Sequence, residues 1–249
     1  MAGHSKWANI KHRKARQDAS RGKVWTKVIR EITVAAKGGP DPSDNPRLRL
    51  ALDKANAANM PKDTIKRAIQ KGSGTGETGA LEELVFEGYG PNGVAILVET
   101  MTDNRNRTVA EVRSSFTKYG GNLGETGSVS FMFNNVGQIL YKKNIMSEDK
   151  IFDIAIEVGA DDVKADENNY EIITTLNEFN NVREKLENIL GVPDQAELIW
   201  YPENNVQIDD ERKATSILKL LDTLDNCEDV QGVYGNFEIN DDIIKKINL

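Results

Sequence analysis

The chain has 249 residues, a formal net charge of −7 and a single cysteine. Its length allows two or three domains and a sizeable core, and one cysteine excludes an intramolecular disulfide. The longest apolar runs, about five to seven residues, are far shorter than a membrane span requires, and no apolar segment of a secretory signal follows the N-terminus. We therefore expect a cytoplasmic protein without a membrane partner.

The charge is divided unequally along the chain. Residues 1–80 hold 17 Lys and Arg against 7 Asp and Glu, a net of +10, whereas residues 81–249 hold 15 against 32, a net of −17. A strongly basic N-terminal part joined to an acidic remainder indicates a polyanionic partner that meets the N-terminal part.

The basic part begins with an arm in which cations surround an aromatic ring. Such an arm can follow a nucleic-acid backbone while the ring stacks on a base. The alternative for Trp7 is that it packs the arm onto the helices that follow. The candidate nucleic-acid-binding residues of the arm are Lys6, Trp7, Lys11, His12, Arg13, Lys14 and Arg16.

Apolar residues at helical spacing predict three short helices after the arm. The first runs from about Ser20 to a stop at Gly38, the second starts at Asn45-Pro46, and the third starts after Pro61 and ends at Gly72. Three such helices predict a small bundle. A glycine-rich run over residues 72–79 then marks a domain boundary.

The first helix carries a row of cations opposite its apolar stripe of Val24, Val28, Ile32 and Ala35. The row consists of Lys23, Lys27, Arg30 and Lys37. Because Glu31 is the only acid in this helix, most of the usual ion pairing between successive turns is absent. We therefore expect phosphates to compensate these charges. The alternative is an ordinary solvated helix face.

Beyond the glycine run, the periodicity predicts a hairpin over residues 84–99 and a helix capped by Asp103 or Asn104, followed by a strand over residues 128–133. Residues 138–200 show the β-α-β-β-α-β order of a ferredoxin-like unit. A helix from about Asp209 and a strand over residues 232–239 complete the chain.

The order of these elements predicts an α+β protein in three parts. The N-terminal three-helix bundle takes residues 1–78. A discontinuous α/β middle domain combines residues 79–133 with 206–249, because the first segment alone lacks a second helix to cover its sheet. The ferredoxin-like domain, residues 134–205, is inserted between its halves.

A second candidate contact with nucleic acid lies where the hairpin meets its helix. The segment 103–108 presents Arg105 and Arg107 beside the backbone N–H groups of a helix start, which attract anions. The alternative is a capped helix with two surface arginines.

Other apparent motifs point away from catalysis. Residues 74–79 match a dinucleotide-binding glycine pattern, but they follow a helix and lead to a strand, the reverse of that fold. No glycine run continues into Lys-Ser or Lys-Thr, and no histidine beyond His12 can act as a base. We expect no enzyme activity, catalytic residue, cofactor, metal site or small-molecule substrate.

Several separated stretches resemble the YebC/PmpR family. They are Met-Ala-Gly-His-Ser-Lys-Trp-Ala-Asn-Ile-Lys-His-Arg-Lys at residues 1–14, and residues 56–63, 87–94, 102–108, 120–124 and 230–237. The resemblance covers the chain, although residues 134–205 match only in general pattern. It implies three domains and a cytoplasmic, non-enzymatic factor in gene expression.

That family is described in two ways, which name different nucleic acids. Many members are described as transcriptional regulators that bind promoter DNA. Mitochondrial relatives are translational activators of cytochrome c oxidase, and some bacterial members act on ribosomes. The leading hypothesis is a regulator that binds DNA through the basic N-terminal domain; the alternative is a ribosome-associated, RNA-binding translation factor. A protein-binding adaptor that works through its acidic body is a further alternative.

Overall fold

The computed structural model describes residues 21–74, 81–166 and 168–247. Residues Phe133–Glu203 form one compact unit, and the segments before and after them together form a second. Helices and mainly antiparallel sheets occur in both units, which confirms the predicted α+β class.

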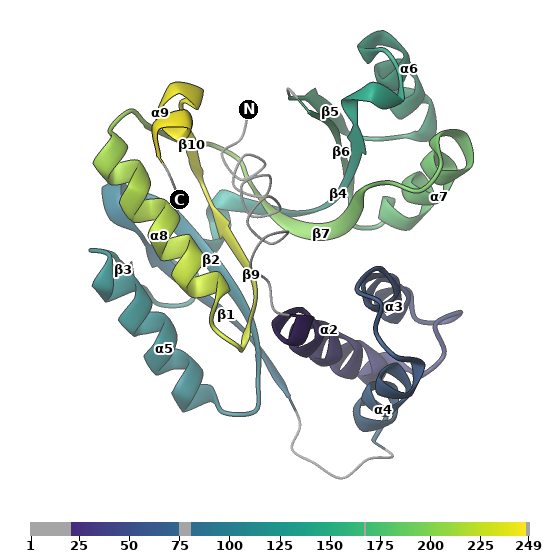
Figure 1. Ribbon diagram of the computed structural model, residues 1–249, viewed down its shortest axis with the longest axis horizontal. Helices are drawn as coiled ribbons and strands as arrows, with labels where there is room; N and C mark the ends of the chain where they lie inside the picture. The colour runs from purple at the N-terminus through teal and green to yellow at the C-terminus, as the bar shows by residue number, and fades with distance from the viewer. Residues whose placement is uncertain (1–20, 75–80, 167, 248–249) are drawn as a thin grey trace. The chain divides into compact units, whose positions relative to one another are not determined.

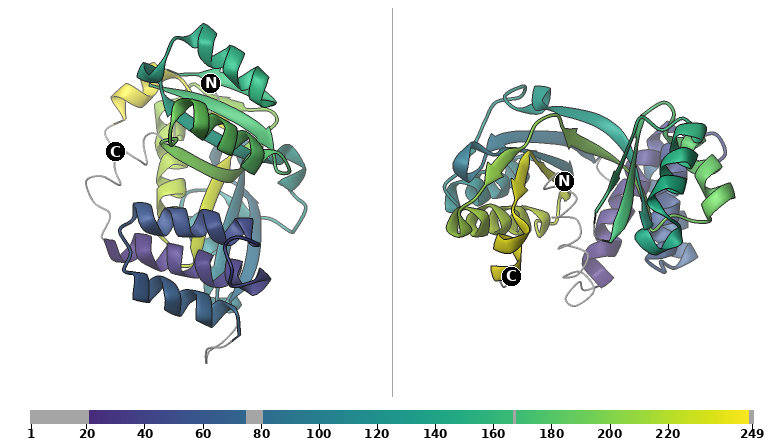
Figure 2. Two further views of the ribbon diagram at one scale, coloured as in Figure 1. Left: turned by 90° about the vertical axis from the view of Figure 1, so that its right-hand side faces the viewer. Right: turned by 90° about the horizontal axis from the view of Figure 1, so that it is seen from above.

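The second unit begins with three helices, α2 (Arg21–Ala35), α3 (Pro46–Ala57) and α4 (Lys62–Gly72), with α2 between the other two (Figure 2). Asn45 fixes the turn into α3, because its carboxamide oxygen accepts from Leu48 N at 3.0 Å while its Nδ2 donates to Ala35 O at 2.7 Å. The fully or nearly fully buried core of these helices is Val28, Ile32, Ala35, Ala36, Leu48, Ala51, Ala55, Met60 and Ala68.

Helix α2 differs from its predicted orientation in two respects. Val24, which the apolar stripe placed inside, is 40% exposed at the start of the helix. Val34, on the other side, is buried with Leu81, which precedes the following sheet, and with Met101 of that sheet. The helix therefore packs on two faces. One face contacts α3 and α4, and Val34 on the other contacts residues of the β1–β2 region.

A four-stranded sheet follows, with strand order β3-β1-β2-β9. β1 (Glu82–Tyr89) and β2 (Ala95–Thr102) form the predicted hairpin around a 3-10 turn, Pro91–Gly93. β3 (Asn122–Leu123) pairs with β1, and β9 (Val230–Gly235) pairs antiparallel with β2. The sheet therefore combines strands from before and after the residues that form the other unit.

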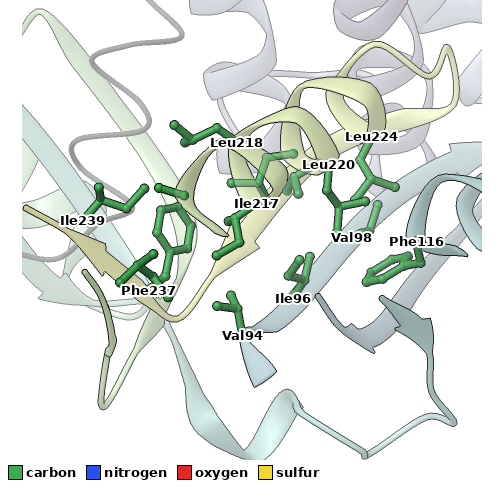
Figure 3. Packing of buried hydrophobic residues seen from close by; sticks show 14 of the residues in the cluster. Val94, Ile96, Val98, Phe116, Ile217, Leu218, Leu220, Leu224, Phe237 and Ile239 are labelled. Carbon is green, nitrogen blue, oxygen red and sulfur yellow. The ribbon is translucent and has the colours of Figure 1, made fainter. Parts of the chain in front are cut away.

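Two helices, α5 (Arg105–Lys118) and α8 (Glu211–Asp225), cover this sheet (Figure 1). Side chains of both helices and of β2 share one core, in which Ile96, Val98 and Phe116 are inaccessible to solvent (Figure 3). Asn104 and Asp210 cap the two helices by accepting from Arg107 N and Lys213 N. The second helix that the sheet of residues 80–133 was predicted to need is therefore α8.

The predicted strand over residues 232–239 is divided in two. β9 ends at Gly235, and β10 (Phe237–Ile239) pairs in parallel with β8 (Val206–Ile208) in a separate sheet. Asn236 causes the change, because its backbone N–H donates to Ala95 O at 3.1 Å while its carbonyl accepts from Val206 N at 2.8 Å. A short helix, α9 (Asp241–Lys246), follows.

The prediction of a strand over residues 128–133 is wrong. A 3-10 turn, Ser130–Met132, occupies half of it, and the strand begins at Phe133. The backbone N–H groups of Gly127, Val129 and Ser130 donate to the carboxylate of Glu87 at 2.7 to 2.8 Å, so these donors are not available to a neighbouring strand.

The first unit, Phe133–Glu203, contains β4 (Phe133–Lys142), a 3-10 turn (Lys143–Ile145), α6 (Glu148–Val158), β5 (Asp162–Ala165), β6 (Asn169–Thr175), α7 (Phe179–Leu190) and β7 (Gln195–Pro202). Its sheet order is β5-β6-β4-β7, with every neighbouring pair antiparallel. Each strand-helix-strand connection thus skips one strand, which is the split β-α-β arrangement of the predicted ferredoxin-like fold.

Candidate nucleic-acid interface

The predicted interface residues fall into three groups. The arm residues Lys6, Trp7, Lys11, His12, Arg13, Lys14 and Arg16 lie outside the described residues, and their role stays a prediction. The second group is the row of cations on α2 with Lys37 just beyond it, and the third is Arg105 and Arg107 at the start of α5.

The α2 cations face a short acidic turn between α8 and β9. Lys27 Nζ lies 3.1 Å from Asp225 Oδ1 and also donates to the Asp225 carbonyl at 2.8 Å. Lys23 Nζ donates to Asn226 Oδ1 at 3.3 Å, and Lys37 Nζ donates to Leu81 O at 2.6 Å. Lys27 is only 24% exposed, so its ammonium group is largely withdrawn from solvent.

Arg30 and Arg107 meet at a buried carboxylate, Asp229, whose side chain is 1% exposed. Arg30 Nη1 lies 2.7 Å from Asp229 Oδ1, and Arg107 Nη2 lies 2.8 Å from Oδ2. The hydroxyl groups of Thr102 and Thr108 donate to the same Oδ2 at 3.1 and 2.7 Å. A buried carboxylate is thus satisfied by two guanidinium groups and two hydroxyls.

The electrostatics of Asp229 follow from these contacts. Burial alone would raise the pKa of its carboxyl, but hydrogen bonds from Thr108 and Arg107 and the positive charge of Arg30 outweigh burial and hold that pKa below its ordinary value. Conversely, the hydrogen bond to Asp229 raises the pKa of Arg107. Asp229 is therefore ionised in the folded protein and joins α2, α5 and β9.

Acids are scarce within α2, as expected, but the inference that its charges are left uncompensated does not hold for Lys27 and Arg30. Asp225, Glu228 and Asp229 supply carboxylates from a segment 198 or more positions further along the chain. No periodicity marks that pairing, because it depends on the tertiary fold. Whether Lys23, Lys27, Arg30 and Lys37 also bind nucleic acid stays a prediction. At Lys27 and Arg30, phosphates would have to compete with these carboxylates.

The two arginines in the first turn of α5 have different contacts. Arg107 is held by Asp229 and, at 3.0 Å, by the exposed Asp103. Arg105 is exposed, and the contacts within the described residues give it no carboxylate partner. The Asn104 side chain already accepts one backbone N–H of this helix start. Of the predicted pair, Arg105 is the side chain that can reach an external phosphate without first breaking an ion pair.

Within the described ranges, no three or more His, Cys, Asp or Glu side chains gather as ligands for a metal ion. The single cysteine, Cys227, is half-buried, and burial raises the pKa of its thiol, which keeps it protonated and weakly nucleophilic. Nor does any helix of the described residues have the length and apolar character needed to cross a bilayer.

The comparisons with known proteins define the class to which this fold belongs. A model of the TACO1/YebC protein N-terminal domain matches residues 5–75, and a model of the TACO1/YebC second and third domain matches residues 81–237. The chain belongs to the TACO1/YebC family. The resemblance to YebC/PmpR proteins is thereby confirmed.

Two relatives illustrate how closely the chain follows this family. A probable transcriptional regulatory protein of Pseudomonas putida is 54% identical over 249 residues, which is 99% of this chain and 100% of the relative. The crystal structure of a conserved hypothetical protein of Aquifex aeolicus is 48% identical, with a TM-score of 0.84 over 90% of this chain and 93% of that one.

Proposed function

We propose that this protein is a non-enzymatic regulator of transcription that binds DNA through its basic N-terminal domain, residues 1–78. The observation that carries the proposal is the charge of +10 within residues 1–80, in a chain whose net charge is −7. The name of the P. putida relative supports a regulator of the same kind. A cytoplasmic location, with access to the chromosome, belongs to this proposal.

Each of the three predicted domains has its own role in this proposal. Residues 1–78 meet the nucleic acid, the middle domain of residues 79–133 and 206–249 supports them, and the inserted domain of residues 134–205 is free for other contacts. The acidic remainder, at −17, repels polyanions from other faces and so orients the bound chain. The arm and Arg105 contact phosphates directly, while the paired cations of α2 exchange carboxylates for phosphates.

The salt dependence of binding tests the proposal on the full chain. If about six phosphates are neutralised, the logarithm of the association constant for duplex DNA falls against the logarithm of salt concentration with a slope of about −5. Fluorescence anisotropy with a labelled duplex and a labelled structured RNA measures both slopes. A flat response with both would overturn the proposal, and a steep response with RNA alone would favour the translation-factor alternative.

The acidic turn offers a sharper test of the α2 cations. In the double variant D225N/E228Q, phosphates no longer compete with two carboxylates for Lys27 and Arg30, so we expect affinity for DNA to rise several-fold at low salt. The control E82Q/E125Q removes the same charge at two exposed positions. An equal gain in both variants would show that only net charge matters, and that α2 does not contact the DNA.

A further inference from the structure

The outer face of α4 carries a second set of cations, distinct from those of α2. Lys62, Lys66, Arg67 and Lys71 are all exposed, and Asp63 is the only acid in the helix. The apolar residues of α4 point the other way, where Ile65, Ala68 and Ile69 pack into the core shared with α2 and α3. At 100° per residue, the four cations cover about half of the helix circumference.

Four other cations of this part of the chain are held by carboxylates, whereas within the described residues those of α4 are not. Lys27 and Arg30 pair with the acidic turn, Arg47 pairs with Glu83 and Lys54 with Glu31. Within the described residues, no ion pair involves the four cations of α4. Arg67 does make one hydrogen bond, from Nε to the backbone carbonyl of Asp63 at 3.2 Å, which leaves its charge uncompensated.

The arrangement includes like-charge pairs that oppose helix formation. Lys62 and Lys66 lie four residues apart, as do Arg67 and Lys71, and each such like-charge pair destabilises a helix by about 0.2–0.5 kcal/mol. The helix also begins without a side-chain cap at Pro61. Its packing against α2 holds it in place instead. The tertiary fold neutralises Lys27 and Arg30 of α2, whereas within the described part of the chain it leaves the charges of α4 uncompensated.

The extent of the face indicates the size of its ligand. From Lys62 to Lys71 the helix rises about 14 Å, at 1.5 Å per residue, and the charges lie on both flanks of the exposed side. A single phosphate or a small anion would contact one or two of these side chains. A chain of regularly spaced phosphates matches all four.

We propose that the outer face of α4, defined by Lys62, Lys66, Arg67 and Lys71, is a contact surface for a nucleic-acid backbone. The inference rests on the proposed function and adds to it a site on the described part of the bundle that needs no carboxylate to be released before phosphates bind. It is an electrostatic surface, so it contributes affinity and orientation rather than base recognition.

The test uses the full-length quadruple variant K62Q/K66Q/R67Q/K71Q and the same anisotropy titrations with duplex DNA and structured RNA. Losing four phosphate contacts should make the salt slope on duplex DNA shallower by about 3 to 4, and lower affinity at least tenfold near 0.1 M salt. The matched control R113Q/R212Q/K213Q/K219Q removes the same charge from exposed residues of α5 and α8. The midpoint temperature of thermal unfolding should be unchanged or slightly higher in the α4 variant, because two repulsive pairs are removed.

The outcomes separate this inference from the proposed function. An unchanged slope in the α4 variant, while the unaltered chain binds with a steep slope, overturns the α4 surface and leaves the proposed function standing. Equal losses in the α4 variant and its control also overturn it, because net charge then explains the effect. No salt-dependent binding by the unaltered chain overturns both. A loss confined to duplex DNA or to RNA supports the surface and identifies the nucleic acid that it meets.

Discussion

Replacing Asp229 by alanine is expected to lower the free energy of unfolding by about 3–5 kcal/mol, the usual cost of removing one member of a buried ion pair. The substitution leaves Arg30 with the exposed Glu228 and leaves the hydroxyls of Thr102 and Thr108 without their shared acceptor. Equilibrium unfolding in urea measures the loss. We expect the loss of stability to affect the unfolding of the unit that contains α2, α5 and β9.

The control for this variant is D103N, since Asp103 also pairs with Arg107, at 3.0 Å, but is 59% exposed. An exposed pair of this kind is worth at most about 1 kcal/mol. The contrast between the two substitutions isolates burial as the cause. If Asp229→Ala cost no more than Asp103→Asn, the buried carboxylate would not be what joins these elements.

The pH dependence of the same site can be assigned a sign. Because the pKa of Asp229 is lower in the folded chain than in the unfolded one, its contribution to stability is complete above the ordinary carboxyl pKa of about 4 and disappears as the pH falls through the lowered value. The difference in stability between the unaltered chain and D229N should therefore be constant from about pH 7 to 5 and shrink below about pH 4. A difference that grew on acidification would contradict this assignment.

Local patterns predicted much of the fold, because the groups involved are neighbours in sequence. Asn45 followed by Pro46 predicts the start of α3. The structure shows the expected cap, in which the Asn45 side chain accepts a hydrogen bond from Leu48 N. The ferredoxin-like order of residues 138–200 was likewise visible, since alternating periods of two and 3.6 residues identify strands and helices in turn.

The errors have a common physical origin in partners that lie far apart along the chain. The strand predicted over residues 128–133 has suitable residues, but Glu87, some 40 positions earlier, takes its backbone donors. In the same way, the sequence shows that the cations of α2 have few acids nearby in the helix. It does not show that Asp225 and Asp229 pair with two of them in the folded chain. The cations of α4 were present in the sequence, but only the tertiary contacts distinguish an uncompensated charge from a paired one.

The second large effect is expected at Glu87, which is 4% exposed and accepts three backbone hydrogen bonds from the loop before β4. Burial would raise the pKa of its carboxyl, but the N–H groups of Gly127, Val129 and Ser130 more than offset it, and that pKa lies below the ordinary value. This carboxylate holds the loop, because it accepts from three of the loop's backbone N–H groups and the segment forms no strand ladder. Without Glu87, the buried amide of Val129 and the less buried amides of Gly127 and Ser130 would lose their acceptors.

In E87Q the side chain keeps its shape, but an NH₂ group must face at least one backbone N–H, so two donors oppose each other. We expect a loss of about 2–4 kcal/mol, because each buried group left unsatisfied costs about 1–3 kcal/mol. Hydrogen exchange at the amides of Gly127, Val129 and Ser130 should accelerate at least about 30-fold. Glu125→Gln, at an exposed position in the same loop, provides the control and should leave exchange unchanged. Equal protection in both variants would mean that the loop is held by its own turns, and that the buried carboxylate merely fills a space beneath it.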